Sequence, residues 1–366
     1  MKNKMKIETT IDSRNTHRNL IVNDIEVSHV AVVNYETRID NAIIRTAGIG
    51  DVRTLDGHQG KGYCRYLMED TIKYMKDEGY DVSTLIGIPD FYDKFGYSSA
   101  TPHVESILNI NRIKNLKPKY SSRKVLDSDF DFIVHLYNNN NKDLTGTVVR
   151  DRAHFYCFYK GSEWFAKTET FIITNEYDKP IGYFVFDKND SKMNVIEVEA
   201  ISNEVYDDIL QSLDFFTRKK NITDIKLFLP VDHDFIVYIR RFWCETKISY
   251  TSNSMNMSRI CNLKSLMKKL QDQISSRANN ITIDLNIKTE EDNVILSIYN
   301  GNVSIKEFGL TTNVLQIPQN ILIQVLYGYR KIKDTIKEPG VYCTNIDDFK
   351  LLEPTRPSYL YLADFF

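Results

Sequence analysis

A glycine-rich stretch, GHQGKGYCRYL, begins at Gly57 and has the residue types that bind phosphate groups. Gly60 and Gly62 would let successive backbone N–H groups turn toward one oxyanion with no Cβ in the way. Helical spacing begins at Tyr63, so the positive end of a helix dipole would point at the same place. The stretch therefore predicts an anion site, although a plain glycine turn has the same composition.

Three phosphate-binding patterns can be compared with this stretch. A Walker A loop requires Ser or Thr after its lysine, and Lys61 is followed by Gly62. A Rossmann GxGxxG that starts at Gly60 requires Gly or Ala where this chain has Arg65. The third pattern is Gln or Arg, two residues, glycine, one residue and a small residue. The sequence QGKGYC fits it, with Cys64 in the small position, and Lys61 and Arg65 add cations nearby.

Other side chains near this stretch could supply acid, base or nucleophile. The Cys64 thiol could attack a substrate, but a small packed side chain fits the same position. Tyr92 lies in FYDKFGY, whose four aromatic residues would by spacing alone form core packing. His29 falls in an alternating strand pattern and His58 lies beside the glycines, and neither is given a role. The five cysteines stand singly, which predicts reduced thiols and gives no support to a zinc site.

The elements around the glycines are predicted to form an α/β unit that positions the anion site. Residues 25–37 and 42–55 are rich in β-branched residues and predict two strands. From 63 to 78 the apolar residues follow helical spacing, and Gly79 would cap the helix. A short strand follows at 82–88. The order of strand, glycine turn, helix and strand places the turn at a helix N-terminus.

A second stretch of the chain repeats this layout. Strands are predicted within 170–187 and 193–202, followed by a helix at 204–220 and a strand at 224–230. Residues 104–252 are therefore interpreted as a divergent internal repeat. Its connection from strand to helix contains no glycine, so the anion site is expected only once in the chain.

The remaining residues have a different character. Helical spacing at 263–274 and 318–334 flanks a run that alternates like a hairpin through Asn300 and Gly301. A chain of 366 residues is too long for one ordinary core. We therefore expect an α+β protein with α/β-type mixed sheets, divided into three domains. The predicted domains are 1–103, 104–252 and 253–366.

The bulk composition limits the class of function. The 47 basic and 49 acidic residues nearly cancel, which argues against a nucleic-acid-binding or membrane-surface protein. No apolar run approaches the ~18 to 20 residues of a membrane span. The N-terminal residues are polar and lack the apolar core of a signal peptide. We expect a globular protein of the cytoplasm.

The order of GIGDVRTL, DGHQGKGYC, helix, strand and FYDKFGY resembles the GNAT N-acetyltransferases. In that family the loop holds the pyrophosphate of acetyl-CoA, and the preceding strand pairs with the pantetheine arm. From residue 21 to 366 the chain is more narrowly similar to the enhanced intracellular survival (Eis-like) family. Its members join an active GNAT domain, a second GNAT domain without a cofactor loop, and a sterol-carrier-protein-like domain. The resemblance implies the same three domains here.

The resemblance also assigns a cofactor site, with acetyl-CoA as cosubstrate and no metal. It implies that the backbone of Val52, Arg53 and Thr54 holds the pantetheine arm. The residues implied for the pyrophosphate are Gly60, Lys61, Gly62, Tyr63, Cys64 and Arg65.

Two further residues match the acid and the base of the family. Tyr92 corresponds to the tyrosine that gives a proton to the departing CoA thiolate. The C-terminal carboxylate, here on Phe366, corresponds to the general base. Burial against aromatic rings would raise the pKa of that carboxyl toward the useful range. In this fold the acetyl group passes directly from CoA to an amine, so Cys64 is not expected to be a nucleophile.

The acceptor is implied only as a class, an aminoglycoside or another small amine. Family members have a strand and two helices before the residue that matches Ile21, and those helices wall the acceptor pocket. Here only a short, largely polar segment, residues 1–20, stands there. Either the pocket is more open, or another chain or domain completes it, or the sequence starts late.

The relatives form large homo-oligomers, so the resemblance implies self-association, as a hexamer. The alternative hypothesis is a non-catalytic CoA- or lipid-binding assembly protein that keeps the GNAT fold. It is suggested by the missing N-terminal helices and by the carrier-like last domain.

Overall fold

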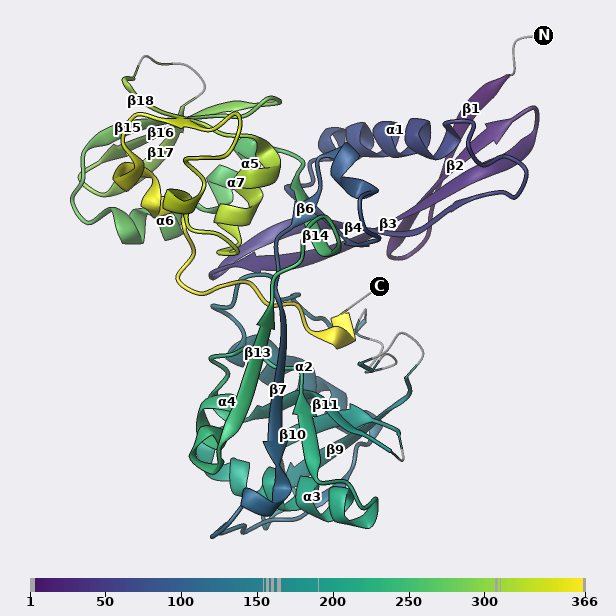
Figure 1. Cartoon of the computed structure of the whole chain (residues 1–366), viewed down its shortest axis with the longest axis vertical. Coiled ribbons are helices and arrows are strands. Elements are labelled where there is room, and N and C mark those ends of the chain that lie inside the picture. Colours follow the sequence, from purple (N-terminus) through teal and green to yellow (C-terminus); the bar gives the residue numbers. More distant parts are fainter. Residues whose placement is uncertain are drawn as a thin grey trace.

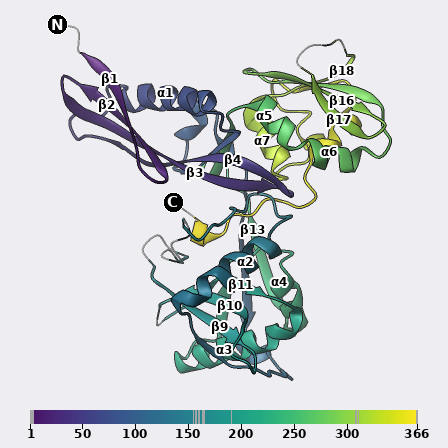
Figure 2. The same ribbon diagram turned by 180° about the vertical axis from the view of Figure 1, so that it is seen from behind.

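A computed structural model describes residues 4–364, apart from residues 154, 156, 157, 159, 160, 163–165, 190, 307, 308 and 310. Two seven-stranded sheets and one five-stranded sheet form this part of the chain, with helices packed against them (Figure 1). The first and third sheets lie side by side in the upper half of the views, and the second sheet lies below both (Figures 1 and 2). Each sheet is mixed, because each contains one parallel pair of strands. The α+β class predicted from the sequence is confirmed.

The first sheet contains the glycine-rich stretch, and its strands lie in the order β1-β2-β3-β4-β5-β14-β6. Helix α1, Tyr63–Asp77, covers one face through buried Leu67, Met68 and Met75. The strands and the helix predicted around the glycines are confirmed. The strands are β1 Met5–Ile11, β2 Asn15–Val22, β3 Ile25–Ile39, β4 Ala42–Thr54, β5 Val82–Gly87, β14 Met255–Ile260 and β6 Ser98–Ser99.

The polar N-terminal residues form strands β1 and β2, which the sequence did not predict. The two strands make an antiparallel hairpin, and β2 pairs with β3. Thr16, Arg18, Leu20 and Val22 alternate as buried residues of β2. Two of these four inward positions, Thr16 and Arg18, are polar, and Arg18 pairs with Asp70 of α1. That mixture hides the alternation of hydrophobic residues by which a half-buried strand is found.

The second sheet repeats the design of the first, in the order β13-β7-β12-β11-β10-β9-β8. One face packs against helix α3, and the opposite face packs against helix α2. The strands and the helix predicted within 170–230 are confirmed. The elements are β13 Cys244–Ser249, β7 His103–Asn109, β12 Asp224–Leu227, β11 Met193–Ala200, β10 Pro180–Asp187, β9 Thr168–Thr174, β8 Ser122–Lys124, α2 Phe130–Asn140, α3 Tyr206–Lys219 and α4 Asp234–Ile239.

Strands β7 and β14 connect the first two sheets, because each lies in a different sheet from the strand that precedes it in the chain. After β6 the chain leaves the first sheet, and β7 pairs with β12 and β13 of the second. After β13 it returns, and β14 enters the first sheet between β5 and β6. Figure 1 shows β7 and β13 side by side in the second sheet, extending toward the first. Residues 255–260, which the predicted division assigns to the third domain, therefore belong to the first sheet.

The third sheet has the order β17-β16-β15-β18-β19. The predicted turn at Asn300 and Gly301 is confirmed, with φ of 53° and 81°. Two predicted helices are shorter than expected, because one is interrupted at Leu270 and the other ends before Gly328, whose φ is +67°. The elements are β15 Ile283–Lys288, β16 Asn293–Tyr299, β17 Asn302–Lys306, β18 Asn313–Gln316, β19 Tyr342–Cys343, α5 Leu263–Lys269, α6 Gln271–Ala278 and α7 Gln319–Leu326.

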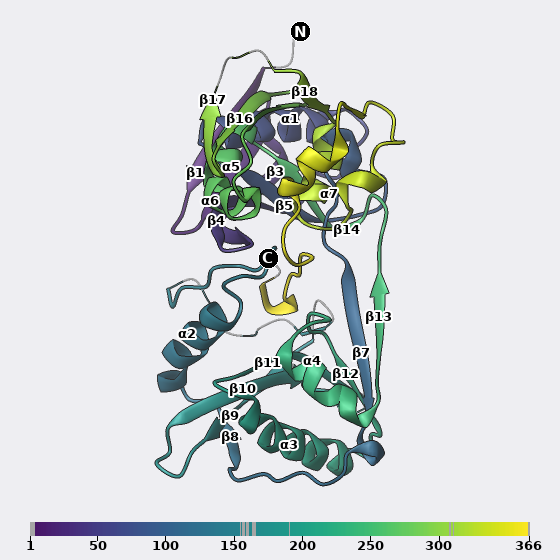
Figure 3. The same cartoon turned by 90° about the vertical axis from the view of Figure 1, so that its left-hand side faces the viewer.

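After the third sheet the chain turns back, and residues 354–364, here called the C-terminal tail, run between the first two sheets (Figure 3). Leu360 packs with Val33 and Tyr35 of the first sheet. Leu362 packs with Tyr183 and other residues of the second. The tail therefore contacts the face of each sheet that lies opposite its helix α1 or α3.

Candidate active site

Strands β4 and β5 pair over a short distance and then separate. Their parallel ladder joins residues 46–48 of β4 to residues 82–84 of β5. Farther along, β5 pairs with β14 on its other side. The facing edge of β4 at residues 49–54 has no partner strand in the described part of the chain. The two strands thus form a fork that begins at Gly48 and Thr84, and one arm of it has free backbone hydrogen-bonding groups.

A β-bulge in β4 accounts for this separation. Asp51 and Val52 together stand opposite the single residue Val30 of β3, and Asp51 has a φ of +45°. An extra residue of this kind bends a strand and increases its local twist. Val52, Arg53 and Thr54, the predicted pantetheine-binding residues, all lie on the free arm.

The glycine loop connects this free arm to α1. Gly57, Gly60 and Gly62 have φ of 76°, 74° and 81°, a region that L-residues rarely adopt. A Cβ on any of the three would meet nothing within 4 Å. Glycine is therefore required by the backbone conformation and not by a crowded neighbour. The open space on these glycines is where a ligand could approach the backbone.

The start of α1 has the properties of an anion site. No described residue accepts a hydrogen bond from the backbone N–H groups of residues 60–65. Gly62 is the N-cap and supplies no side-chain cap, and the first turn contains no acidic residue. The positive end of the helix dipole is thus left uncompensated. Lys61 and Arg65 are both exposed, so their cations are available to the same ligand.

Tyr92 begins a short 3-10 helix, Tyr92–Phe95, and is buried in the core between α1 and the first sheet. Its ring packs edge-on against Phe91, with the ring centroids 4.8 Å apart. Burial, and to a lesser degree the neighbouring Cys64, raise the pKa of Tyr92 above its ordinary value of 10.0. The phenol is therefore protonated at neutral pH, and core packing and proton donation are compatible in this side chain.

Cys64 is half-buried at the start of α1, and burial raises the pKa of its thiol. Activated cysteines have a lowered pKa, because the thiolate is the reactive form. The local environment thus argues against a nucleophilic role. Cys64, Cys244, Cys261 and Cys343 are free thiols, whereas Cys157 lies outside the described residues.

Cys64 is expected to react more slowly with iodoacetamide in the folded protein than in the unfolded chain. At pH 8 a raised pKa leaves a smaller thiolate fraction, and burial adds a steric barrier, so a decrease of about fivefold or more is expected. Mass spectrometry of the Cys64 peptide after timed alkylation, with and without urea, measures the ratio. Faster alkylation in the folded state would identify an activated thiol.

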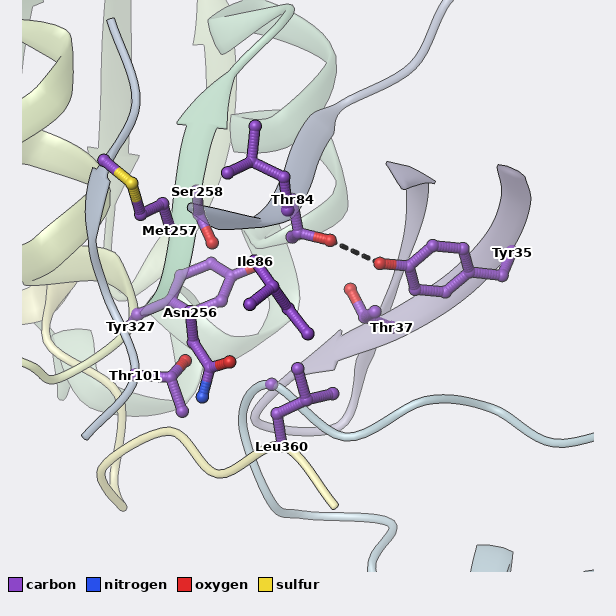
Figure 4. Close-up of a pocket in the computed structure, with 12 residues that line it drawn as sticks. Tyr35, Thr37, Thr84, Ile86, Thr101, Asn256, Met257, Ser258, Tyr327 and Leu360 are labelled. Atoms are coloured by element: carbon purple, nitrogen blue, oxygen red, sulfur yellow. Dashed lines mark hydrogen bonds between the residues drawn. The ribbon is translucent and has the colours of Figure 1, made fainter. Parts of the chain in front are cut away.

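A small pocket with both polar and apolar lining lies beside the fork on the sheet face opposite α1 (Figure 4). Tyr35 and Thr37 of β3 line it, together with Thr84 at the start of the fork. The Tyr35 hydroxyl contacts the Thr84 hydroxyl, and Leu360 of the C-terminal tail closes another side. The free volume of about 20 Å³ is enough for one or two water molecules.

One buried polar atom gives water a reason to enter this pocket. Asn256 Oδ1 has no hydrogen-bond partner in the described part of the chain, whereas the Tyr327 hydroxyl interacts with Thr37 and Ser258. Buried polar groups of this kind are normally satisfied by ordered water. The sequence did not single out Tyr35, Thr84 or Tyr327, because each has an unremarkable residue type for its strand or helix.

The face opposite α1 is partly covered by a segment from the second repeat. The amide of Val149 donates to Glu36 O at 2.8 Å, and that of Gly146 donates to Arg38 O at 2.7 Å. Thr37 forms an isolated β-bridge with Val148. Another part of the same chain therefore pairs with β3 at this face of the first sheet.

Three other titratable candidates from the sequence are Phe366, His29 and His58. Phe366 lies outside the described residues. His29 is buried, its Nδ1 lies 2.6 Å from Asn19 Oδ1, and burial followed by Arg53 lowers its pKa. The His58 ring packs near Tyr63, and its Nδ1 has no partner among the described groups. Neither histidine gains a role from these contacts.

Within the described residues, no three or more His, Cys, Asp or Glu side chains are grouped so that they could bind a metal ion. None of the helices in that part of the chain has the length and apolar character needed to cross a membrane.

Known proteins share parts of this sequence and this fold. Residues 11–100 match the family model described as an acetyltransferase (GNAT) domain. No curated protein matches the sequence. A probable N-acyltransferase from Enterococcus faecalis V583 is similar with a TM-score of 0.80 and 13% identity, over 100% of both chains.

Two further solved structures share the fold. A GCN5-related N-acetyltransferase from Kribbella flavida has a TM-score of 0.73 and 15% identity, over 96% of this chain and 87% of that one. Eis1 from Mycobacterium abscessus has a TM-score of 0.69 and 13% identity, over 97% and 91%. Residues 11–100 therefore match a GNAT acetyltransferase domain, within a fold that the chain shares along nearly its whole length with these three solved structures.

Proposed function

We propose that this protein transfers the acetyl group of acetyl-CoA to the amine of a small molecule. The observation that carries the proposal is the fork of β4 and β5 next to a loop of unpaired N–H groups at the start of α1. A ligand with an extended amide arm and a pyrophosphate has groups that fit both features. The match of residues 11–100 to a GNAT domain supports the same assignment.

The residues present fit acetyl-CoA in the order in which they occur. Val52, Arg53 and Thr54 offer free backbone groups to the pantetheine arm, and residues 60–65 offer N–H groups and two cations to the pyrophosphate. The acetyl group would then lie near the start of the fork. The acceptor would approach from the face opposite α1, since α1 and its core fill the other side.

The chemical step is assigned to three groups. The acceptor nitrogen attacks the thioester carbonyl carbon, the C–N bond forms, and the C–S bond breaks. Tyr92 gives its proton to the departing thiolate, and the Phe366 carboxylate takes the proton that the amine loses. The raised pKa of Tyr92 supports the first assignment, because it keeps the phenol protonated until the thiolate forms.

A thiol-release assay with acetyl-CoA and a panel of small amines, aminoglycosides included, tests the proposal. We expect CoA to be released only when an amine is present. Gly62→Val should raise the KM for acetyl-CoA by about tenfold or more, because a branched side chain is strained at a φ of +81° and disturbs the loop. Binding of acetyl-CoA without turnover over the whole panel would favour the alternative, a non-catalytic CoA- or lipid-binding protein.

The proposal includes three further points that rest on the resemblance. The chain would contain domains at 1–103, 104–252 and 253–366, the last of them sterol-carrier-protein-like, except that β14 at residues 255–260 completes the first sheet. It would act in the cytoplasm. It would self-associate as a homo-oligomer, a hexamer in the related family, which light scattering after gel filtration can measure.

A further inference from the structure

The C-terminal tail is attached to all three sheets or the loops beside them. The amide of Ser358 donates to Tyr327 O at 2.9 Å, and its hydroxyl donates to Ala100 O at 2.8 Å. The amide of Tyr359 donates to Thr145 O at 2.8 Å. The tail is thus held by specific contacts along its course and is not a loosely packed end.

A buried ion cluster ends the described tail. Arg150 donates through both of its terminal nitrogens to Glu197, each at 2.7 Å. Its Nε donates to Asp364 Oδ1 at 2.7 Å, and its Nη2 donates to Asp364 Oδ2 at 3.0 Å. The three side chains are only 1%, 0% and 4% exposed. Tyr137 also donates to Asp364, at 3.0 Å.

The cluster binds the buried carboxylate of the tail through several donors. Glu197 pairs with Arg150, and Asp364 is a second buried carboxylate that interacts with two cations, Arg150 and the buried Arg38. Burying it costs free energy unless its oxygens are well hydrogen-bonded. Both of its oxygens accept from Arg150, and one also accepts from Tyr137. The second repeat thus provides the donors that hold the tail, Arg150 and Tyr137 of α2.

The backbone of the tail is fitted to its path at a second point. Gly146 has a φ of +87°, and a Cβ built there would lie 2.8 Å from Tyr359 O and 3.2 Å from Ser358 Cβ. Only glycine permits the segment from the second repeat to approach the tail this closely. The tail therefore packs closely against Gly146 and is bound by Arg150. Between these two points, Leu360 lines the pocket beside the fork.

We propose that Asp364, bound by Arg150, is the positioning residue that sets where the chain end lies relative to the fork. This inference rests on the proposed function, in which the carboxylate of Phe366 is the base. Phe366 follows Asp364 by two residues in the sequence, so the anchor at Asp364 stands next to the segment that would carry the base. The second repeat, which has no glycine loop, thereby serves the reaction of the first by holding the tail.

Asp364→Asn tests the proposal with little change of shape. We expect kcat for acetyl transfer to fall about tenfold to hundredfold, with the Kd of acetyl-CoA unchanged, because the base is misplaced and the cofactor site is untouched. Removal of Phe366 should lower kcat strongly in the wild type but little further in Asp364→Asn. Such non-additivity indicates that both changes act on the same group. Asp364→Glu should recover part of the activity.

A readout that needs no turnover accompanies these rates. Carboxypeptidase should release the terminal phenylalanines of native Asp364→Asn about tenfold faster than those of the wild type, since the tail opens more often. Asp232→Asn is the matched control, because Asp232 also pairs with the tail, through Arg356 at 2.6 Å, but on the surface. We expect this control to behave like the wild type in every assay.

The outcomes separate this proposal from the proposed function. Wild-type kcat and wild-type carboxypeptidase resistance in Asp364→Asn would overturn the positioning role. Additive losses from Asp364→Asn and removal of Phe366 would also overturn it. Absence of turnover in the wild type would refute the proposed function, and with it the catalytic role of the contact between Asp364 and Arg150. Carboxypeptidase could still confirm in that case that Asp364 holds the tail.

Discussion

Tyr92→Phe should lower the kcat of acetyl transfer about 100-fold or more and leave the Kd of acetyl-CoA unchanged. The substitution removes only the hydroxyl, so the edge-on packing against Phe91 is retained. The CoA thiolate would then leave without a proton donor, and a well-placed general acid contributes about 10²- to 10⁴-fold to a rate. Steady-state kinetics and isothermal titration with acetyl-CoA measure the two quantities.

Tyr80→Phe is the matched control for this variant. Tyr80 is buried in the same core cluster, and its ring lies 4.3 Å below the Arg45 guanidinium, a contact that phenylalanine also makes. We expect a kcat within about threefold of the wild type, because only a phenol remote from the reacting atoms is lost. Equal rates for Tyr92→Phe and the wild type would remove Tyr92 from the mechanism.

The pH profile gives a second check on Tyr92. The phenol donates only while it is protonated, and burial raises its pKa above 10.0. The acid function should therefore persist through neutral and mildly alkaline pH and be lost only above pH 10. An alkaline loss of kcat near pH 8 that disappears in Tyr92→Phe would contradict the raised pKa.

Arg150→Met is expected to lower the free energy of unfolding by about 3–5 kcal/mol. Methionine approximates the length of the side chain but leaves Glu197 and Asp364 buried without their cation. Breaking a buried ion pair from one side has a cost of this size, because the remaining charge stays desolvated. Urea unfolding at pH 7, followed by fluorescence, measures the difference.

The destabilisation should also depend on pH in a defined direction. Burial already raises the pKa of the Glu197 carboxyl, and loss of Arg150 removes the cation that lowers it, so protonation of Glu197 favours the folded state of the variant. The deficit relative to the wild type should then be smallest near pH 4 and grow toward pH 7. Arg356→Met, which breaks the half-exposed pair with Asp232, should cost at most about 1 kcal/mol. A similar small loss for Arg150→Met would show that its cluster is not important for stability.

The candidate cofactor site could be predicted because the residues that form it are close together in the sequence. Gly60 and Gly62 adopt positive φ, and α1 begins one residue later, so a short run of sequence contains both the anion-binding backbone and the helix dipole. The alternating strand pattern of β3 and β4 is likewise carried by neighbouring residues. Strand β2 was missed for the converse reason, since its inward positions include Thr16 and Arg18.

The amino-acid sequence by itself determined the class of the fold, the single glycine loop and the helix that follows it, because backbone conformation depends on near neighbours. Only the tertiary structure decided three other features: the exchange of β7 and β14, the course of the C-terminal tail, and the cluster in which Arg150 meets a partner 214 residues away. These contacts join segments whose own patterns are ordinary, so no local period marks them. They form because strand edges, buried charges and apolar faces must be satisfied over the whole molecule at once.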